Sequence, residues 1–284
     1  MLKILLWVVS KDKQFLQDAV NILERQHNGL EIVGKVAGED ISNFDREVDV
    51  ILVIGAKNIG MSKITQAARQ LKLSEEKLLG DWIACIPGFT LKNYRRLQRS
   101  RLSIFSMNCF GGILSHTLGL PFRSPFVNMF MGEEGFINLL REPRIYMEKN
   151  FVLKKMEWQS VLKFNYPVVT LGNVDIHMNH CKTFDDAITK WNERKERINW
   201  YNLFVTMYTD NKEILREFDA LPYSKKVCFV PFKSDLDSAW YINPEIKHGF
   251  SFWNVVNTFG MGDPFYYDPF DMLLYGKKTP LINM

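Results

Sequence analysis

Hydrophobic and polar positions follow two different periods along residues 1–90. Uninterrupted apolar runs are typical of strands buried on both faces of a parallel sheet, and apolar residues three or four positions apart are typical of helices. Their alternation favours a small doubly wound sheet. The expected strands are residues 3–9, 30–37, 48–54 and 82–86, and the expected helices are residues 12–26 and 59–71.

The turn after the first strand lacks the glycines of a dinucleotide-binding fold. A G-x-G-x-x-G pattern would need glycine at Val8, Ser10 and Lys13. Such glycines let the backbone reach a pyrophosphate at a helix N-terminus. We therefore predict the fold without nucleotide binding. A weak anion site that uses Lys11, Lys13 and the helix N-terminus is the alternative.

Aromatic residues mark a change in the chain near residue 100. The sequence contains 21 Phe, 10 Tyr and 7 Trp, and only six of these precede residue 101. We expect an α/β protein with two domains: a degenerate Rossmann-like domain, residues 1–98, and a larger aromatic-rich α/β domain, residues 99–284.

A predicted strand, residues 102–106, leads into the turn Ser106-Met-Asn108-Cys109-Phe-Gly111-Gly112. A strand, a glycine-containing turn and a helix start suit a nucleophile, because first-turn N–H groups stabilise an oxyanion. A helix N-terminus also lowers the pKa of a cysteine. Cys109 is the candidate nucleophile, with Asn108 and the two glycines as oxyanion donors. The alternative is that Cys109 is a small buried packing residue.

Arg123 and Ser124 stand between a proline turn and a predicted buried strand, residues 126–131. Arginine binds carboxylate or phosphate through two parallel hydrogen bonds, which suits a ligand-facing loop. A salt bridge within the loop is the alternative.

Residues 174–181 carry a third polar cluster. Alternation on a strand would put Asp175, His177, Asn179 and Cys181 on one face, with His180 on the other. His177 is the candidate general base, oriented by Asp175. His180 and His116 are alternative bases, and a hydrogen-bonded structural histidine is the competing interpretation. Two histidines three apart on a strand diverge, so we expect no metal.

The helix expected after residue 183 begins with a capping box, Thr183-Phe-Asp-Asp186. Arg194, with Lys190 and Arg197, offers a cationic face for an anionic sugar or nucleotide. An ordinary solvated face is the alternative.

Two features near the C-terminus suggest other functions. Asp235-Leu-Asp237 matches the D-x-D with which many glycosyltransferases hold a divalent metal, although one such match is expected by chance among 16 aspartates. The aromatic residues of 240–275 suit a core or subunit interface, or a sugar-binding surface. A non-catalytic carbohydrate-binding or assembly protein is therefore a further alternative.

Charge and cysteine content limit the partners. The net charge is +4, from 36 basic and 32 acidic residues, which argues against nucleic acid. No stretch approaches the ~20 apolar residues of a membrane span. Four widely spaced cysteines without a C-x-x-C pair indicate neither structural zinc nor a disulfide scaffold, so we expect a cytoplasmic protein. The sequence does not identify a cofactor, and it leaves open whether the chain forms a homo-oligomer.

Four ordered segments, residues 106–112, 118–125, 175–180 and 190–198, resemble a bacterial exopolysaccharide-biosynthesis family of unknown function. The resemblance covers about residues 100–275, and some members carry a Rossmann-like module before this region. It implies a role in surface polysaccharide synthesis but no particular reaction. Together with the residues above, it predicts a transferase acting on a sugar, sugar-phosphate or sugar-linked precursor.

Overall fold

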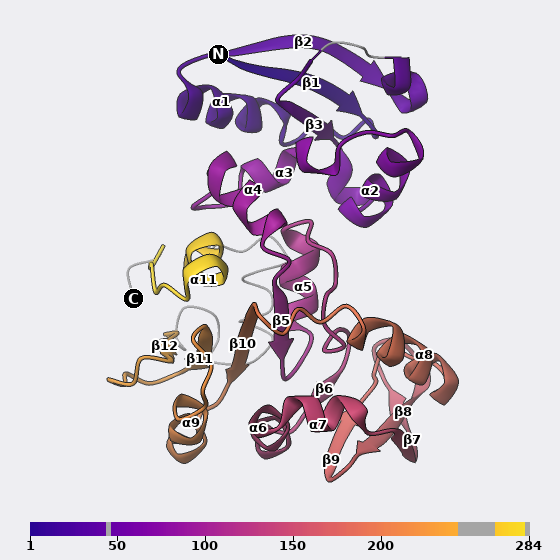
Figure 1. Ribbon diagram of the computed structural model, residues 1–284, viewed down its shortest axis with the longest axis vertical. Helices are drawn as coiled ribbons and strands as arrows, with labels where there is room; N and C mark the ends of the chain where they lie inside the picture. Colours follow the sequence, from indigo (N-terminus) through magenta and orange to yellow (C-terminus); the bar gives the residue numbers. More distant parts are fainter. Residues whose placement is uncertain (44–46, 244–264, 282–284) are drawn as a thin grey trace. The chain divides into compact units, whose positions relative to one another are not determined.

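The computed structural model describes residues 1–43, 47–243 and 265–281, and it divides into two compact units (Figure 1). The first unit is Met1–Ser100 with Ser115–Pro121, and the second is Arg101–Leu114 with Phe122–Met284. Both contain parallel sheets combined with helices, which confirms the predicted α/β class. The sequence-based division after residue 98 lies two residues before the end of Met1–Ser100.

The first unit is built on a parallel sheet of order β2-β1-β3-β4. Its strands are β1 (Leu2–Val8), β2 (Leu30–Ala37), β3 (Val50–Ile54) and β4 (Leu78–Gly80). Its helices are α1 (Leu16–His27), α2 (Met61–Gln70), α3 (Asp81–Ala84) and α4 (Leu91–Arg99), with short 3₁₀ turns η1 (Gly38–Asn43), η2 (Ala56–Asn58) and η3 (Glu75–Lys77).

The prediction of a strand at residues 82–86 is wrong. The fourth strand is β4, and Asp81–Ala84 forms the helical turn α3, in which Asp81 Oδ1 accepts a hydrogen bond from the Trp82 N–H (3.0 Å). Residues 81–84 are all buried. A short run buried on every side shows no periodicity, so its pattern does not distinguish helix from strand.

Contacts between two turns close the end of the sheet between β1 and β3. Gly55, directly after β3, has φ +75°, and a Cβ there would lie 2.6 Å from Ser10 Cβ and 2.8 Å from Asp12 O. The Asn58 side chain donates to Asp12 Oδ2 (3.0 Å), and the Gly55 N–H donates to Asp81 Oδ2 (3.0 Å). Only a glycine allows this approach and this backbone angle.

The second unit contains two sheets. The parallel sheet has order β12-β11-β10-β5, and the antiparallel sheet has order β6-β9-β8-β7. The strands are β5 (Ser103–Ser106), β6 (Phe130–Met131), β7 (Phe151–Gln159), β8 (Phe164–Leu171), β9 (Val174–His177), β10 (Leu203–Tyr208), β11 (Lys226–Val230) and β12 (Ala239–Tyr241). The helices are α5 (Phe110–Thr117, whose last three residues belong to the first unit), α6 (Glu133–Arg141), α7 (Pro143–Glu148), α8 (Phe184–Lys195), α9 (Lys212–Asp219) and α11 (Pro269–Tyr275).

Phe126 is the centre of the aromatic core of the second unit. Its buried ring lies 4.7 Å from the ring of Phe105 on β5, 6.1 Å from Phe136 on α6 and 5.7 Å from Trp191 on α8, measured between centroids. The predicted strand over residues 126–131 is nevertheless mostly loop, and only Phe130–Met131 pairs as β6. Asn128, with φ +61°, interrupts the extended backbone.

The aromatic residues near the C-terminus that the structure describes belong mainly to the core. Trp240, Tyr266, Tyr267 and Phe270 are all buried. Phe250, Phe252, Trp253 and Phe259 lie outside the described residues. Within the described part of the chain, no helix is long and apolar enough to cross a bilayer.

The contact at Gly55 predicts a stability difference between two glycine substitutions. Gly55→Ala and Gly38→Ala both put alanine at positive φ, +75° and +54°, but a Cβ at Gly38 would meet nothing within 4 Å. We expect Gly55→Ala to lower the free energy of unfolding by about 2 kcal/mol more than Gly38→Ala, because it adds overpacking to the shared backbone cost. Urea denaturation of both variants measures the difference, and equal losses would contradict the close contact.

Candidate functional site

The turn between β5 and α5 is held by Ser106 and Asn108, which are both buried. Asn108 Oδ1 accepts from the Phe110 N–H (3.1 Å), and the Ser106 hydroxyl lies 3.1 Å from the same oxygen. The Cys109 carbonyl accepts the first hydrogen bond of α5, from Ile113 (2.9 Å). The sequence-predicted strand, polar turn and helix start are therefore present, with Cys109 directly before the first residue of the helix.

Gly111 and Gly112 lie within α5 and not in the turn itself, and they permit close packing. Neither has positive φ. A Cβ at Gly111 would lie 2.9 Å from Ile104 Cγ2, and one at Gly112 would lie 3.0 Å from Val127 Cγ1. The missing side chains let α5 approach β5 and the 122–128 segment.

His180, not His177, lies beside Cys109. The Cys109 Sγ atom is 3.9 Å from His180 Nε2 and 3.9 Å from the Met129 carbonyl oxygen. Cys109 is 6% exposed, whereas His180 is exposed. The pair therefore joins a buried thiol to an imidazole that solvent can reach, within the reach of a weak sulfur hydrogen bond.

The expectation that the helix N-terminus lowers the Cys109 pKa is wrong. Burial raises the pKa of this thiol to about 11, because its surroundings disfavour a charged sulfur. Partial burial, with the charge of Lys190 adding to it, lowers the pKa of His180. At neutral pH the pair is therefore a neutral thiol beside a neutral imidazole, which can accept the thiol proton.

Asp175 and His177 have other partners. His177 stacks on Phe130, with ring centroids 4.3 Å apart, and its Nδ1 lies 3.2 Å from the Tyr166 hydroxyl. The Asp175 carboxylate accepts a hydrogen bond from the Thr170 hydroxyl and forms an ion pair with Lys154. The contact with Lys154 lowers the pKa of Asp175. Asp175 thus does not hydrogen-bond to His177, and the proposed orienting contact is absent between these two described residues.

The single polar face predicted for residues 175–181 is interrupted at His177, where β9 ends. The turn that follows buries Met178, Asn179 and Cys181 and exposes His180, so His180 does not share the buried face of Ile176 and Met178 as strand alternation predicted. This change of direction is what puts the ring of His180 within reach of Cys109.

Helix α8 follows this turn, and Thr183 caps it by accepting from the Asp186 N–H (3.1 Å). Lys190 Nζ lies 2.7 Å from Asp186 Oδ2 and 4.0 Å from Cys181 Sγ. Arg194 donates to the Val127 carbonyl oxygen (2.9 Å), and burial lowers the pKa of its guanidinium. Arg194 therefore ties α8 to the 122–128 segment, and Lys190 is the cation whose charge acts on His180.

The 122–128 segment also contains Arg123 and Ser124. Ser124 is buried, and its hydroxyl accepts from the Phe126 N–H (3.1 Å), so it shapes the turn. Arg123 is partly exposed. His116, the third candidate base, belongs to the first unit, where its ring borders Gly60.

A small cavity of about 10 Å³ lies at the carboxyl ends of β5, β10 and β11, with room for about one water molecule. Ser106, Asn108 and Thr206 supply its polar lining. Thr206 Oγ1 is buried without a hydrogen-bond partner among the described residues. Sequence reasoning missed Thr206, because a single threonine within an apolar strand gives no signal.

The alternative metal site has no support in geometry. Asp235 and Asp237 are both exposed in the loop between β11 and β12. In the described part of the chain, no three His, Cys, Asp or Glu side chains converge as metal ligands.

A parallel sheet with a cysteine at a helix start and an adjacent histidine defines the chain as an α/β protein with a Cys/His pair. Residues 84–276 match the family described as "Domain of unknown function (DUF1919)", so the chain belongs to that family. It is also 32% identical over 187 residues to an "Uncharacterized protein" of Haemophilus influenzae, across 62% of this chain and 84% of that relative. All the candidate site residues, 106–194, fall inside the family match.

The cap at Thr183 predicts a graded stability effect. Thr183→Ala removes the acceptor of the Asp186 N–H, so we expect it to lower the free energy of unfolding by about 1 kcal/mol. Thr183→Ser keeps the hydroxyl and should lose much less. Thermal or urea unfolding of the two variants measures this, and equal stability of Thr183→Ala and the unmodified chain would contradict the cap.

The raised pKa of Cys109 predicts slow, strongly pH-dependent alkylation. Because the thiolate reacts, the rate with iodoacetamide should increase about tenfold per pH unit as pH rises toward the pKa of about 11. Mass spectrometry of the peptide that contains Cys109 measures the rate, with glutathione as the unburied control. A rate that levels off below pH 8 would contradict the effect of burial.

Proposed function

We propose that the chain is a group transferase of surface-polysaccharide synthesis, in which Cys109 and His180 act on a sugar-linked precursor. The observation that carries this proposal is the 3.9 Å approach of Cys109 Sγ to His180 Nε2 at the start of α5. The resemblance to an exopolysaccharide-biosynthesis family supports the choice of pathway. Four free thiols suit the reducing cytoplasm, where we place the protein.

The pair supports acyl transfer through a thioester. As the acyl carbon of the donor reaches Cys109, the thiol proton passes to His180 Nε2 and sulfur forms a bond to that carbon. The carbonyl electrons move to oxygen and then return to expel the leaving group, which takes the proton from His180. A sugar hydroxyl next attacks the thioester, gives its proton to His180 and displaces the sulfur, which His180 reprotonates. No electron is gained or lost overall.

The start of α5 supplies donors for the charged intermediate. The Asn108 Oδ1 atom is used within the turn, so its Nδ2 amide is the side-chain group suited to an oxyanion. First-turn N–H groups, here that of Gly112, point out of the N-terminal end of a helix. Lys190, whose charge acts on His180, favours a donor that carries negative charge.

Four variants test the proposal in the source organism, with the chain deleted and supplied again. We expect Cys109→Ala and His180→Gln to abolish surface polymer, measured as cell-surface sugar. His177→Gln is the matched control, since His177 contacts Phe130 and Tyr166 and does not contact Cys109. Cys85→Ala, in the first unit, controls for loss of a thiol.

Unfolding temperatures of the purified variants separate loss of chemistry from loss of fold. Normal polymer from a folded Cys109→Ala variant would exclude the thioester route. Loss of polymer in His177→Gln together with normal polymer in His180→Gln would show that His177, and not His180, is the base.

A further inference from the structure

We propose that the first unit binds a phosphate ester at the carboxyl ends of β1 and β2, with Lys13 and Lys35 holding the phosphate. A pocket of about 530 Å³ opens there. Its lining residues are Val8, Lys11, Lys13, Lys35, Val36, Ala37 and Asp40. The site is separate from the Cys109–His180 pair, so neither proposal depends on the other.

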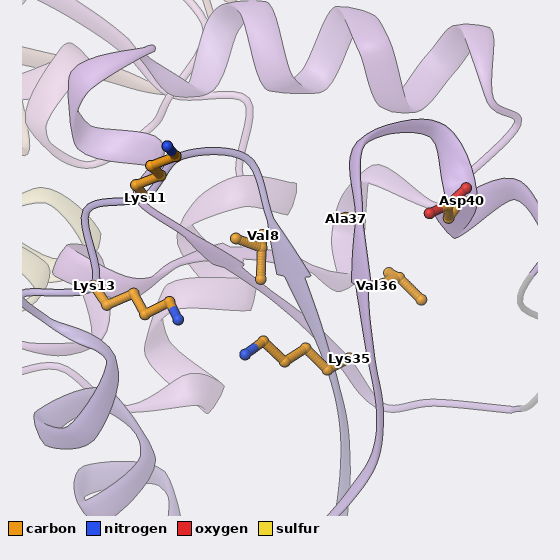
Figure 2. Close-up of a pocket in the computed structure, with 7 residues that line it drawn as sticks. All are labelled: Val8, Lys11, Lys13, Lys35, Val36, Ala37 and Asp40. Atoms are coloured by element: carbon orange, nitrogen blue, oxygen red, sulfur yellow. The ribbon is translucent and has the colours of Figure 1, made fainter.

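Strand pairing brings the lysines together from two parts of the chain. Val8 at the end of β1 pairs with Ala37 at the end of β2, so both carboxyl ends meet at the pocket. Figure 2 shows the side chains of Lys13 and Lys35 extending toward one another, with Lys11 on the other side of Val8. Lys13 comes from the turn before α1 and Lys35 from β2.

The charges of the pocket are unbalanced. Lys11, Lys13 and Lys35 are exposed, and no hydrogen bond or ion pair engages their ammonium groups within the described part of the chain. Asp40, on the far side of β2 in Figure 2, is the one carboxylate among the lining residues. A phosphate dianion between the ammonium groups would offset their repulsion.

The pocket lies on the β2 side of β1, not at the usual crevice of a doubly wound sheet. That crevice forms where strand order reverses, here between β1 and β3. The contacts of Gly55 with Ser10 and Asp12 close it. Because lysine side chains would hold the phosphate in place of backbone N–H groups, the absence of glycine after β1 does not exclude binding here.

The lining residues other than the lysines favour a phosphate ester over free phosphate. Val8, Val36 and Ala37 give the pocket an apolar wall that contacts the carbon skeleton of a ligand. The Asp40 carboxylate can accept a hydrogen bond from a ligand hydroxyl. A sugar phosphate and a nucleoside monophosphate share this chemistry.

Calorimetric titration of the full chain at low salt tests the site with three probes: inorganic phosphate, glucose 1-phosphate and uridine monophosphate. We expect an ester to bind more tightly than inorganic phosphate, and the tighter ester identifies the source. Lys13→Gln and Lys35→Gln should each weaken that binding about fivefold, and the double variant more. Lys63→Gln, an exposed lysine of α2 outside the pocket, is the charge-matched control and should leave it unchanged.

Three results would overturn the proposal. They are no binding of any probe to the unmodified chain, an affinity for inorganic phosphate that equals or exceeds that for both esters, and an equal loss in Lys63→Gln and the pocket variants. The unfolding temperature of each variant without ligand shows whether the fold is kept, and the exposed positions of the lysines predict that it is.

Discussion

Close packing of α5 on β5 is the contact on which the candidate site of the second unit depends. Two consecutive glycines remove the side chains that would hold the helix away from Ile104 and Val127. The helix therefore begins after a turn of only three residues, and Cys109, the last of these, is fixed at that point. Arg194 binds the carbonyl of the same Val127, which ties α8 to this segment. The turn before α8 then carries His180 to the thiol.

Local features of the second unit could be predicted where neighbouring residues decide them. The β5–α5 turn and the cap at Thr183 each depend on side chains within three residues of the backbone groups that they bind. The choice between His177 and His180 depends on where β9 ends, and pairing with β6 and β8 sets that limit. Strand alternation, extended beyond His177, placed His180 on the same face as Ile176 and Met178, whereas the turn buries Met178 and exposes His180.

Burial explains why the pKa of Cys109 is raised where the sequence predicted that it would be lowered. A cysteine at a helix start is activated when it is hydrated, but Cys109 lies among core residues of the second unit. Its pKa therefore follows its surroundings and not the helix end. In the first unit, the alternation of strands and helices was sufficient to predict the sheet. It was not sufficient for residues 81–84, because all four, including Asp81, are buried and the run has no exposed position that would reveal a helical or strand period.

The high pKa of Cys109 also bears on chemical damage. With a pKa of about 11, only about one thiol in 10,000 is ionised at pH 7. Peroxides attack the thiolate, so the resting sulfur resists oxidation to the sulfenic acid and the irreversible states beyond it. A ligand whose binding causes the Cys109 thiol to lose its proton to His180 would end that resistance. The burial that raises the pKa of Cys109 thus also protects its thiol from oxidation.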